Sequence, residues 1–192
     1  MGKFFEDLNR VLVAGVVLAV VAFLILHLSK FEGTAYLAFI LRAIHVWFGI
    51  LWIGLLYYFN FVQIPSMPKI PDEQKPAIGK VIAPTALFYF RWAAALTMLL
   101  GLVLAGDNGY LGQALTFQSG FATIGLGMWL GLIMGANVWG VIWPNQKKAL
   151  GIVTVDADAK KKAARTAMIA SRVNTMLSIP MLYCMVGQSH FG

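Results

Sequence analysis

Residues 35–63 read AYLAFILRAIHVWFGILWIGLLYYFNFVQ, a largely apolar stretch that holds one arginine, one histidine and no acidic residue. About 20 predominantly apolar residues cross the hydrocarbon core of a bilayer as a helix, so this stretch is long enough to span a membrane with some tilt. Four other stretches reach a similar length. The predicted spans are 11–29, 35–63, 82–105, 120–143 and 166–188. The sequence therefore predicts an all-α protein, an integral membrane bundle of five transmembrane helices that forms a single domain over residues 1–192.

The composition supports this class and excludes others. Of the 192 residues, 59% are hydrophobic and 12% are charged, whereas charged residues make up about a quarter of a typical soluble domain. The net charge of +7 lies in short loops between apolar stretches, so no nucleic-acid-binding face is predicted. The single cysteine, Cys184, lies in the last span, which excludes an intrachain disulfide and the Cys-x-x-Cys-His attachment motif of a c-type haem.

The loops differ in charge, and this difference predicts the orientation, because cytoplasmic loops carry an excess of lysine and arginine. The N-terminus and the loops 64–81 and 144–165 are basic, whereas the 106–119 loop and the C-terminus contain neither lysine nor arginine. The expected topology is N-terminus in and C-terminus out. Pro65, Pro68 and Pro71 are expected to end the second helix, since proline cannot continue a regular helix.

Ionisable side chains at bilayer depth are costly, so each is a candidate functional residue. The predicted spans contain five: His27, Arg42, His45, Arg91 and Arg172. All eight acidic residues fall outside the spans, so the arginines have no carboxylate partner within a span. Their partners could be a loop acid, backbone carbonyls, lipid phosphates, or an anionic ligand such as a haem propionate or a charged substrate.

Four residues of the second span share one helical stripe: Arg42, His45, Gly49 and Trp52. Their spacing of i, i+3, i+7 and i+10 places them on one face. A haem on that face would use the His45 imidazole as an iron ligand, the missing side chain of Gly49 for close approach, and Arg42 near its propionates. The spacing is equally typical of a histidine bonded to a neighbouring helix, a packing glycine and an arginine reaching toward water.

The three histidines all fall on the predicted outer side, which fits one haem b with two axial histidines better than two haems. His45 is the first candidate ligand of this metal site and His190, just past the last span, is the second. His27 is more typical of a residue at the membrane interface. A mobile terminal residue is the alternative for His190.

Arg91, Arg172, Asn137 and Asn174 fall in the inner halves of their spans, together with Asn60. These side chains could form a cationic pocket open toward the cytoplasm, suited to a flat anion with several hydrogen-bonding edges. The asparagines could equally serve as polar contacts between helices. That alternative leaves the two arginines without a countercharge.

Several long strings resemble one family. They are HVWFGILWIGLLYYFNFVQIP at 45–65, FRW at 90–92, NVWGVIWPNQKK at 137–148 and ASRVNTMLSIP at 170–180. They are similar to the membrane domain of the bacterial cytochrome-c-linked urate oxidases, from about residue 36 to the C-terminus. A more distant similarity links the chain to the membrane protoporphyrinogen oxidases.

The resemblance implies a multi-pass protein of the bacterial inner membrane that oxidises urate to 5-hydroxyisourate, with electrons passed to a periplasmic c-type cytochrome. That cytochrome is fused to the membrane domain in the family, whereas this sequence ends at Gly192 without one. The leading hypothesis is a membrane-bound b-type haem redox protein that passes electrons outward to a separate cytochrome c. The alternative is a non-catalytic accessory subunit of a larger respiratory or photosynthetic membrane complex.

Overall fold

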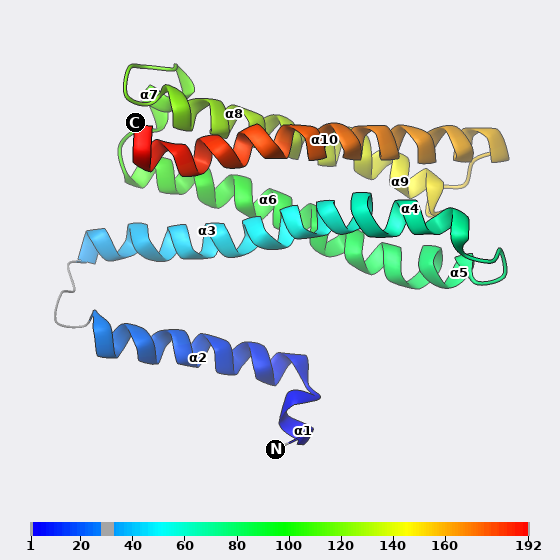
Figure 1. Cartoon of the computed structure of the whole chain (residues 1–192), viewed down its shortest axis with the longest axis horizontal. Helices are drawn as coiled ribbons and strands as arrows, with labels where there is room; N and C mark the ends of the chain where they lie inside the picture. The colour runs from blue at the N-terminus through cyan, green and yellow to red at the C-terminus, as the bar shows by residue number, and fades with distance from the viewer. Residues whose placement is uncertain (1, 28–32, 192) are drawn as a thin grey trace. The chain divides into compact units, whose positions relative to one another are not determined.

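The computed structural model describes residues 2–27 and 33–191, and every regular element within them is helical (Figure 1). Contacts divide the chain into two units, residues 1–39 and 40–192, with the boundary inside one long helix. The two units are described separately below.

The first unit contains a short helix, α1 (Gly2–Phe5), and a long apolar helix, α2 (Leu8–Leu26). Asp7 caps α2, because its carboxylate accepts hydrogen bonds from the backbone N–H groups of Asn9 and Arg10. No side chain of α2 is buried within the structure. A helix of this length that is apolar all round is compatible with a membrane span.

The second unit is built from four long helical segments, three of which change helical type along their length. They are α3 (Gly33–Tyr57) with η2 (Tyr58–Gln63), α4 (Ile64–Ser66) and η3 (Met67–Lys69); α5 (Lys75–Ala77) with η4 (Ile78–Ile82) and α6 (Ala83–Asp107); α8 (Ala122–Asn137) with η5 (Val138–Ile142) and α9 (Trp143–Ala149); and α10 (Ala157–Phe191). The short α7 (Leu111–Leu115) precedes α8.

The five predicted spans are confirmed as helices long and apolar enough to cross a membrane: Leu8–Leu26, Tyr36–Lys69, Lys75–Asp107, Ala122–Ala149 and Ala157–His190. Four of the five are longer than predicted, mainly at the ends that carry lysines. In the first span the predicted end, residues 28 and 29, lies outside the described residues. The orientation across the membrane stays a prediction.

The prediction that the prolines after residue 63 end the second helix is wrong for Pro65 and Pro68, because helical structure continues to Lys69. A wider turn precedes Pro65, since the N–H of Ile64 bonds to the carbonyl of Phe59, five residues back. Two other prolines follow a bond of the same kind. The N–H of Ala83, before Pro84, bonds to the Ile78 carbonyl, and the N–H of Trp143, before Pro144, bonds to the Val138 carbonyl. A π-type turn relieves the clash between a proline ring and the carbonyl four residues before it. The helices therefore run through these prolines.

The helices of the second unit run alternately up and down, so the turns 70–74 and 150–156 lie at one end of it, opposite α7 and the C-terminal end of α10 (Figure 1). Most lysines of the unit lie at the end with the two turns, which we call the basic end: Lys69, Lys75, Lys80, Lys147, Lys148, Lys160, Lys161 and Lys162. The arrangement fits the charge asymmetry of the loops.

The main core lies in the middle of this unit, where Trp52, Leu56, Phe90, Met134 and Val138 are each no more than 2% exposed. A smaller cluster lies near α7 and contains Ala105, Ala114, Ile124 and Met128. These two clusters fix α3, α6, α8 and α10 side by side. They set the positions of the candidate residues.

Candidate functional site

His45 is half-buried on α3 and is held against α6. Its Nδ1 lies 2.9 Å from the backbone carbonyl oxygen of Thr97. A carbonyl can only accept, so Nδ1 donates the proton and Nε2 keeps its lone pair. The ring rests on Gly101, where an added Cβ would lie 2.8 Å from the His45 Cε1. Only glycine at position 101 admits this ring, and the arrangement is the one that metal-ligating histidines adopt.

The other two interior members of the predicted stripe also face the bundle. An added Cβ at Gly49 would lie 3.8 Å from the Thr97 Cγ2, so Gly49 lies at the contact with α6. Trp52 is 1% exposed, and its Nε1 has no hydrogen-bond partner within the described part of the chain. Gly49 therefore has a packing role here. Its predicted role in the approach of a macrocycle stays a prediction.

Arg42, the fourth member, is exposed. It lies close enough to Tyr110, in the loop after α6, to act on its charge. Burial raises the pKa of Tyr110, and the Arg42 guanidinium opposes this by favouring the phenolate. Within residues 2–27 and 33–191, Arg42 makes no ion pair.

The structure does not bring His190 to His45. Met98, on the turn before Gly101, lies against Gly135 of α8, and the neighbouring Met134 carbonyl accepts a hydrogen bond from Asn174 of α10. His45 is therefore level with this part of α10. His190 lies 16 residues beyond Asn174, which is about 24 Å at the rise of an α-helix. One iron needs its two nitrogen ligands only about 4 Å apart, so the two imidazoles do not share an iron in this arrangement.

The C-terminal part of α10 instead holds the start of α8. Gln188 accepts a hydrogen bond from the Ile124 N–H at 2.9 Å and donates to the Gly120 carbonyl at 2.8 Å. It thus satisfies an N–H of the first turn of α8 that has no partner within the helix. This contact places His190 beside the α7 end of the unit.

Asn137 and Asn174 are brought together. Asn137 Nδ2 donates to Asn174 Oδ1 at 2.7 Å and to the Ala170 carbonyl at 2.9 Å. Asn174 is fully buried, and its Nδ2 donates to the Met134 carbonyl at 2.9 Å. Asn60 donates to the hydroxyl of Ser171 at 2.7 Å, so three helices meet in one polar layer. The amide groups of Asn137 and Asn174 are used between helices, as the packing alternative predicts.

The two arginines of the predicted pocket lie apart from that layer. Arg172 is exposed on α10, whereas Asn174, two residues on, is fully buried. Residues two apart on a helix point to different faces, so the two side chains do not line one pocket. Arg91 is half-buried on α6, and its guanidinium carbon lies 3.9 Å from the ring centroid of Trp143.

Thr97 and Gly101 are the contacts of His45 that sequence reasoning missed. They lie four residues apart on α6, the spacing of one helical turn, but nothing in the sequence pairs that turn with His45. A small residue opposite a buried ring is a signal only once the helix pairing is known.

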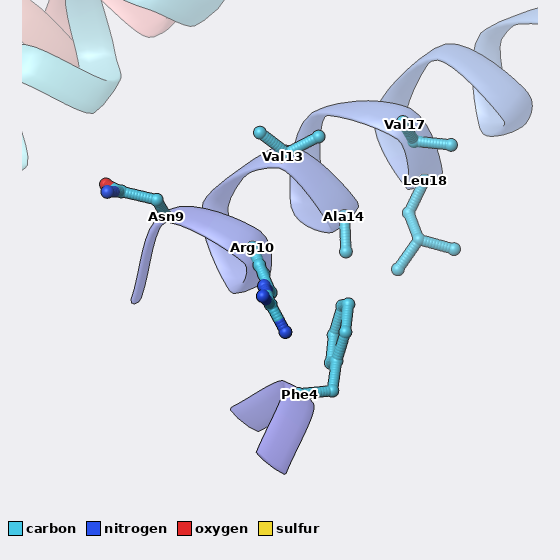
Figure 2. A pocket seen from close by; sticks show the side chains of 7 residues that line it. All are labelled: Phe4, Asn9, Arg10, Val13, Ala14, Val17 and Leu18. Atoms are coloured by element: carbon cyan, nitrogen blue, oxygen red, sulfur yellow. The ribbon is translucent and has the colours of Figure 1, made fainter. Parts of the chain in front are cut away.

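The described residues contain no group of three or more histidine, cysteine, aspartate or glutamate side chains suited to a metal ion. A pocket in the first unit is lined by Phe4 of α1 and by Asn9, Arg10, Val13, Ala14, Val17 and Leu18 of α2 (Figure 2). Its lining is almost entirely apolar, and Phe4 points toward Ala14 and Leu18 (Figure 2). It contains none of the candidate residues.

The C-terminal part of the chain matches a known family. Residues 109–192 match the family described as urate oxidase N-terminal. No curated protein and no solved structure matches the chain. The matched region runs from the loop after α6 through α10, and includes Asn137, Trp143, Asn174 and His190. The resemblance to the urate oxidases is thus confirmed as a match of residues 109–192 to the family described as urate oxidase N-terminal.

Proposed function

We propose that the chain is a membrane redox domain of the urate oxidase type, which holds one b-type haem through His45. The observation that carries the proposal is the 2.9 Å hydrogen bond from His45 Nδ1 to the Thr97 carbonyl. It fixes the tautomer and the ring plane, and it leaves Nε2 as the ligand atom. The match of residues 109–192 to the urate oxidase N-terminal family supports the reaction class.

The residues around His45 fit an axial ligand. Gly101 leaves room for the Nδ1–Cε1 edge of the imidazole against α6, so the ring is held by both a hydrogen bond and a steric contact. Haem, when bound, supplies a one-electron redox centre whose potential depends on its axial ligand and nearby charge. Arg42, one turn before His45 and without an ion pair in the described segments, would offset the charge of a propionate.

The direction of electron transfer follows from the charge asymmetry. His45 lies in the half of its helix away from the basic end, and the positive-inside rule puts the basic end in the cytoplasm. Electrons would then leave on the periplasmic side, where a c-type cytochrome is the acceptor that the resemblance implies. The proposed substrate class, also from the resemblance, is a urate-like purine.

The haem proposal is tested by a reduced-minus-oxidised spectrum of the purified chain and of His45→Ala. We expect a b-type band in the wild-type protein and its loss in the variant. Thr97 contributes a backbone carbonyl, so Thr97→Ser is the matched control on α6 and should keep the band. A wild-type protein without any haem band contradicts the proposal.

The reaction class is tested separately. The purified chain, mixed with urate and oxidised cytochrome c, should reduce the cytochrome at a rate that depends on urate, and His45→Ala should abolish this. A haem-containing chain that reduces no cytochrome with urate would retain the redox assignment and contradict the substrate class.

A further inference from the structure

A cluster of two cations around one indole lies near the basic end, apart from His45. The guanidinium carbon of Arg91 lies 3.9 Å from the Trp143 ring centroid and 5.3 Å from that of Phe88. The ammonium of Lys147, one turn further along α9, lies 5.8 Å from the same Trp143 ring. Two positive charges from separate helices therefore share a single aromatic face or its rim.

Within the described segments, neither cation of this cluster forms an ion pair with an acidic residue. Among the described residues the ion pairs are Asp7 with Arg10 and Asp72 with Lys75, and neither involves Arg91 or Lys147. The Nε1 of Trp139, one turn before Trp143, is buried and also has no hydrogen-bond partner in the described part of the chain. Arg91 and Lys147 thus lie against one indole without an acidic partner among the described residues, which suits them to an anionic ligand.

The position of the cluster indicates the source of that charge. Trp143 ends the predicted fourth span, and Lys147 and Lys148 follow it at the boundary between the apolar segment and the loop. Tryptophan at this depth is typical of the interface, where lipid headgroups lie. The Arg91 side chain reaches Trp143 from within its own span, which is how arginines extend from the membrane core toward headgroups.

We propose that Arg91, Trp143 and Lys147 bind the phosphate of an anionic phospholipid headgroup. The planar guanidinium can donate two parallel hydrogen bonds to phosphate oxygens, and the lysine adds a mobile charge. Basic pockets between transmembrane helices on the cytoplasmic side are typical sites for such headgroups. The site is separate from the proposed haem ligand, and neither depends on the other.

The test measures thermal unfolding of the full chain in detergent while phosphatidylglycerol is added, with phosphatidylcholine as the uncharged reference. We expect stabilisation by phosphatidylglycerol only, with the half-maximal lipid concentration raised about fivefold by Arg91→Gln or by Lys147→Gln. Lys161→Gln removes the same charge from an exposed position at the same end, and should change that concentration less than twofold.

Three results would overturn the proposal. Equal stabilisation by both lipids would exclude headgroup recognition. An equal rise in the half-maximal lipid concentration in Lys161→Gln and Arg91→Gln would show that the lipid responds to net charge and not to this site. Stabilisation by glycerol phosphate as strong as that by the lipid would make the ligand a free phosphate. Should Arg91→Gln not fold, Arg91→Lys gives the same test, because it keeps the charge and loses the paired hydrogen bonds. We expect its half-maximal lipid concentration to lie between those of wild type and Lys147→Gln.

Discussion

Asn137 and Asn174 join α8 to α10 at the centre of the bundle, through a hydrogen bond of 2.7 Å from Asn137 Nδ2 to Asn174 Oδ1. Each amide also donates to a backbone carbonyl, Asn137 to Ala170 and Asn174 to Met134. The pair therefore locks the register of the two helices. The positions of the other candidate residues on α10, including His190, relative to α8 depend on this register.

Replacing Asn174 with alanine should destabilise the protein by about 1–2 kcal/mol, because two bonds between helices are lost and the freed groups stay buried. Asn145→Ala is the matched control, since the Asn145 side chain bonds only to the Val141 carbonyl of its own helix. Unfolding in mixed detergent measures both changes. Equal free energies for the two variants would show that the Asn137–Asn174 pair contributes nothing specific.

Two glycines of α8 should respond oppositely to alanine. An added Cβ at Gly125 would clash with the Ala114 carbonyl oxygen, which is backbone and cannot move without shifting α7, whereas an added Cβ at Gly131 would meet nothing within 4 Å. We expect Gly125→Ala to cost on the order of 2 kcal/mol or more. Gly131→Ala should be neutral or stabilise by up to about 1 kcal/mol. Thermal melts of both variants test this, and similar melting temperatures would mean that α7 does not pack on α8 as described.

Asp72, in the turn after η3, forms an ion pair with Lys75. The hydrogen bond and the positive charge of Lys75 lower the pKa of Asp72. The ionised Asp72 is therefore favoured in the folded protein. Its contribution to stability is present above the ordinary pKa of an aspartate and is lost as the pH falls through the lowered value.

Lys75→Gln should return the Asp72 pKa upward toward its ordinary value, whereas Lys80→Gln should leave it unchanged. Carboxyl carbon chemical shifts followed by NMR between about pH 2 and 6 would measure the titration. The same Asp72 titration in wild type and Lys75→Gln would show that the ion pair does not form in solution.

Arg42 should tune the proposed redox centre. A nearby cation favours the reduced state, which carries one positive charge fewer, so Arg42→Gln should lower the midpoint potential by tens of millivolts, the scale of an exposed charge interaction. Arg165→Gln, which removes an exposed charge at the basic end, should have little effect. A redox titration of both variants distinguishes a local effect of Arg42 from a general effect of charge, which would lower both potentials alike.

The sequence predicted the class of fold because hydropathy and loop charge act along the chain. The five spans needed no knowledge of helix pairing, and their bounds were missed mainly where prolines follow π-type turns, as at Pro65 and Pro144. A π-type turn forms where a backbone N–H bonds to the carbonyl five residues back instead of four, and side-chain identity alone does not determine which of these bonds forms.

The candidate site was predictable only in part. Helical spacing predicts one face for Arg42, His45, Gly49 and Trp52, of which Arg42 is exposed and the other three are buried or half-buried. It could not show that Gly49 meets Thr97, or that His190 lies far along α10 from His45, because both depend on how α3, α6, α8 and α10 are aligned. Spacing also grouped Arg172 with Asn174, although two residues along one helix separate an exposed face from a buried one.

Ligation of haem by His45 and not by His190 is tested by the haem content of the purified wild type, His45→Ala and His190→Ala. Pyridine haemochrome assays against protein concentration give the ratio. We predict one haem per chain in wild type and in His190→Ala, and almost none in His45→Ala. Full haem content in His45→Ala, or its loss only in His190→Ala, would contradict the claim.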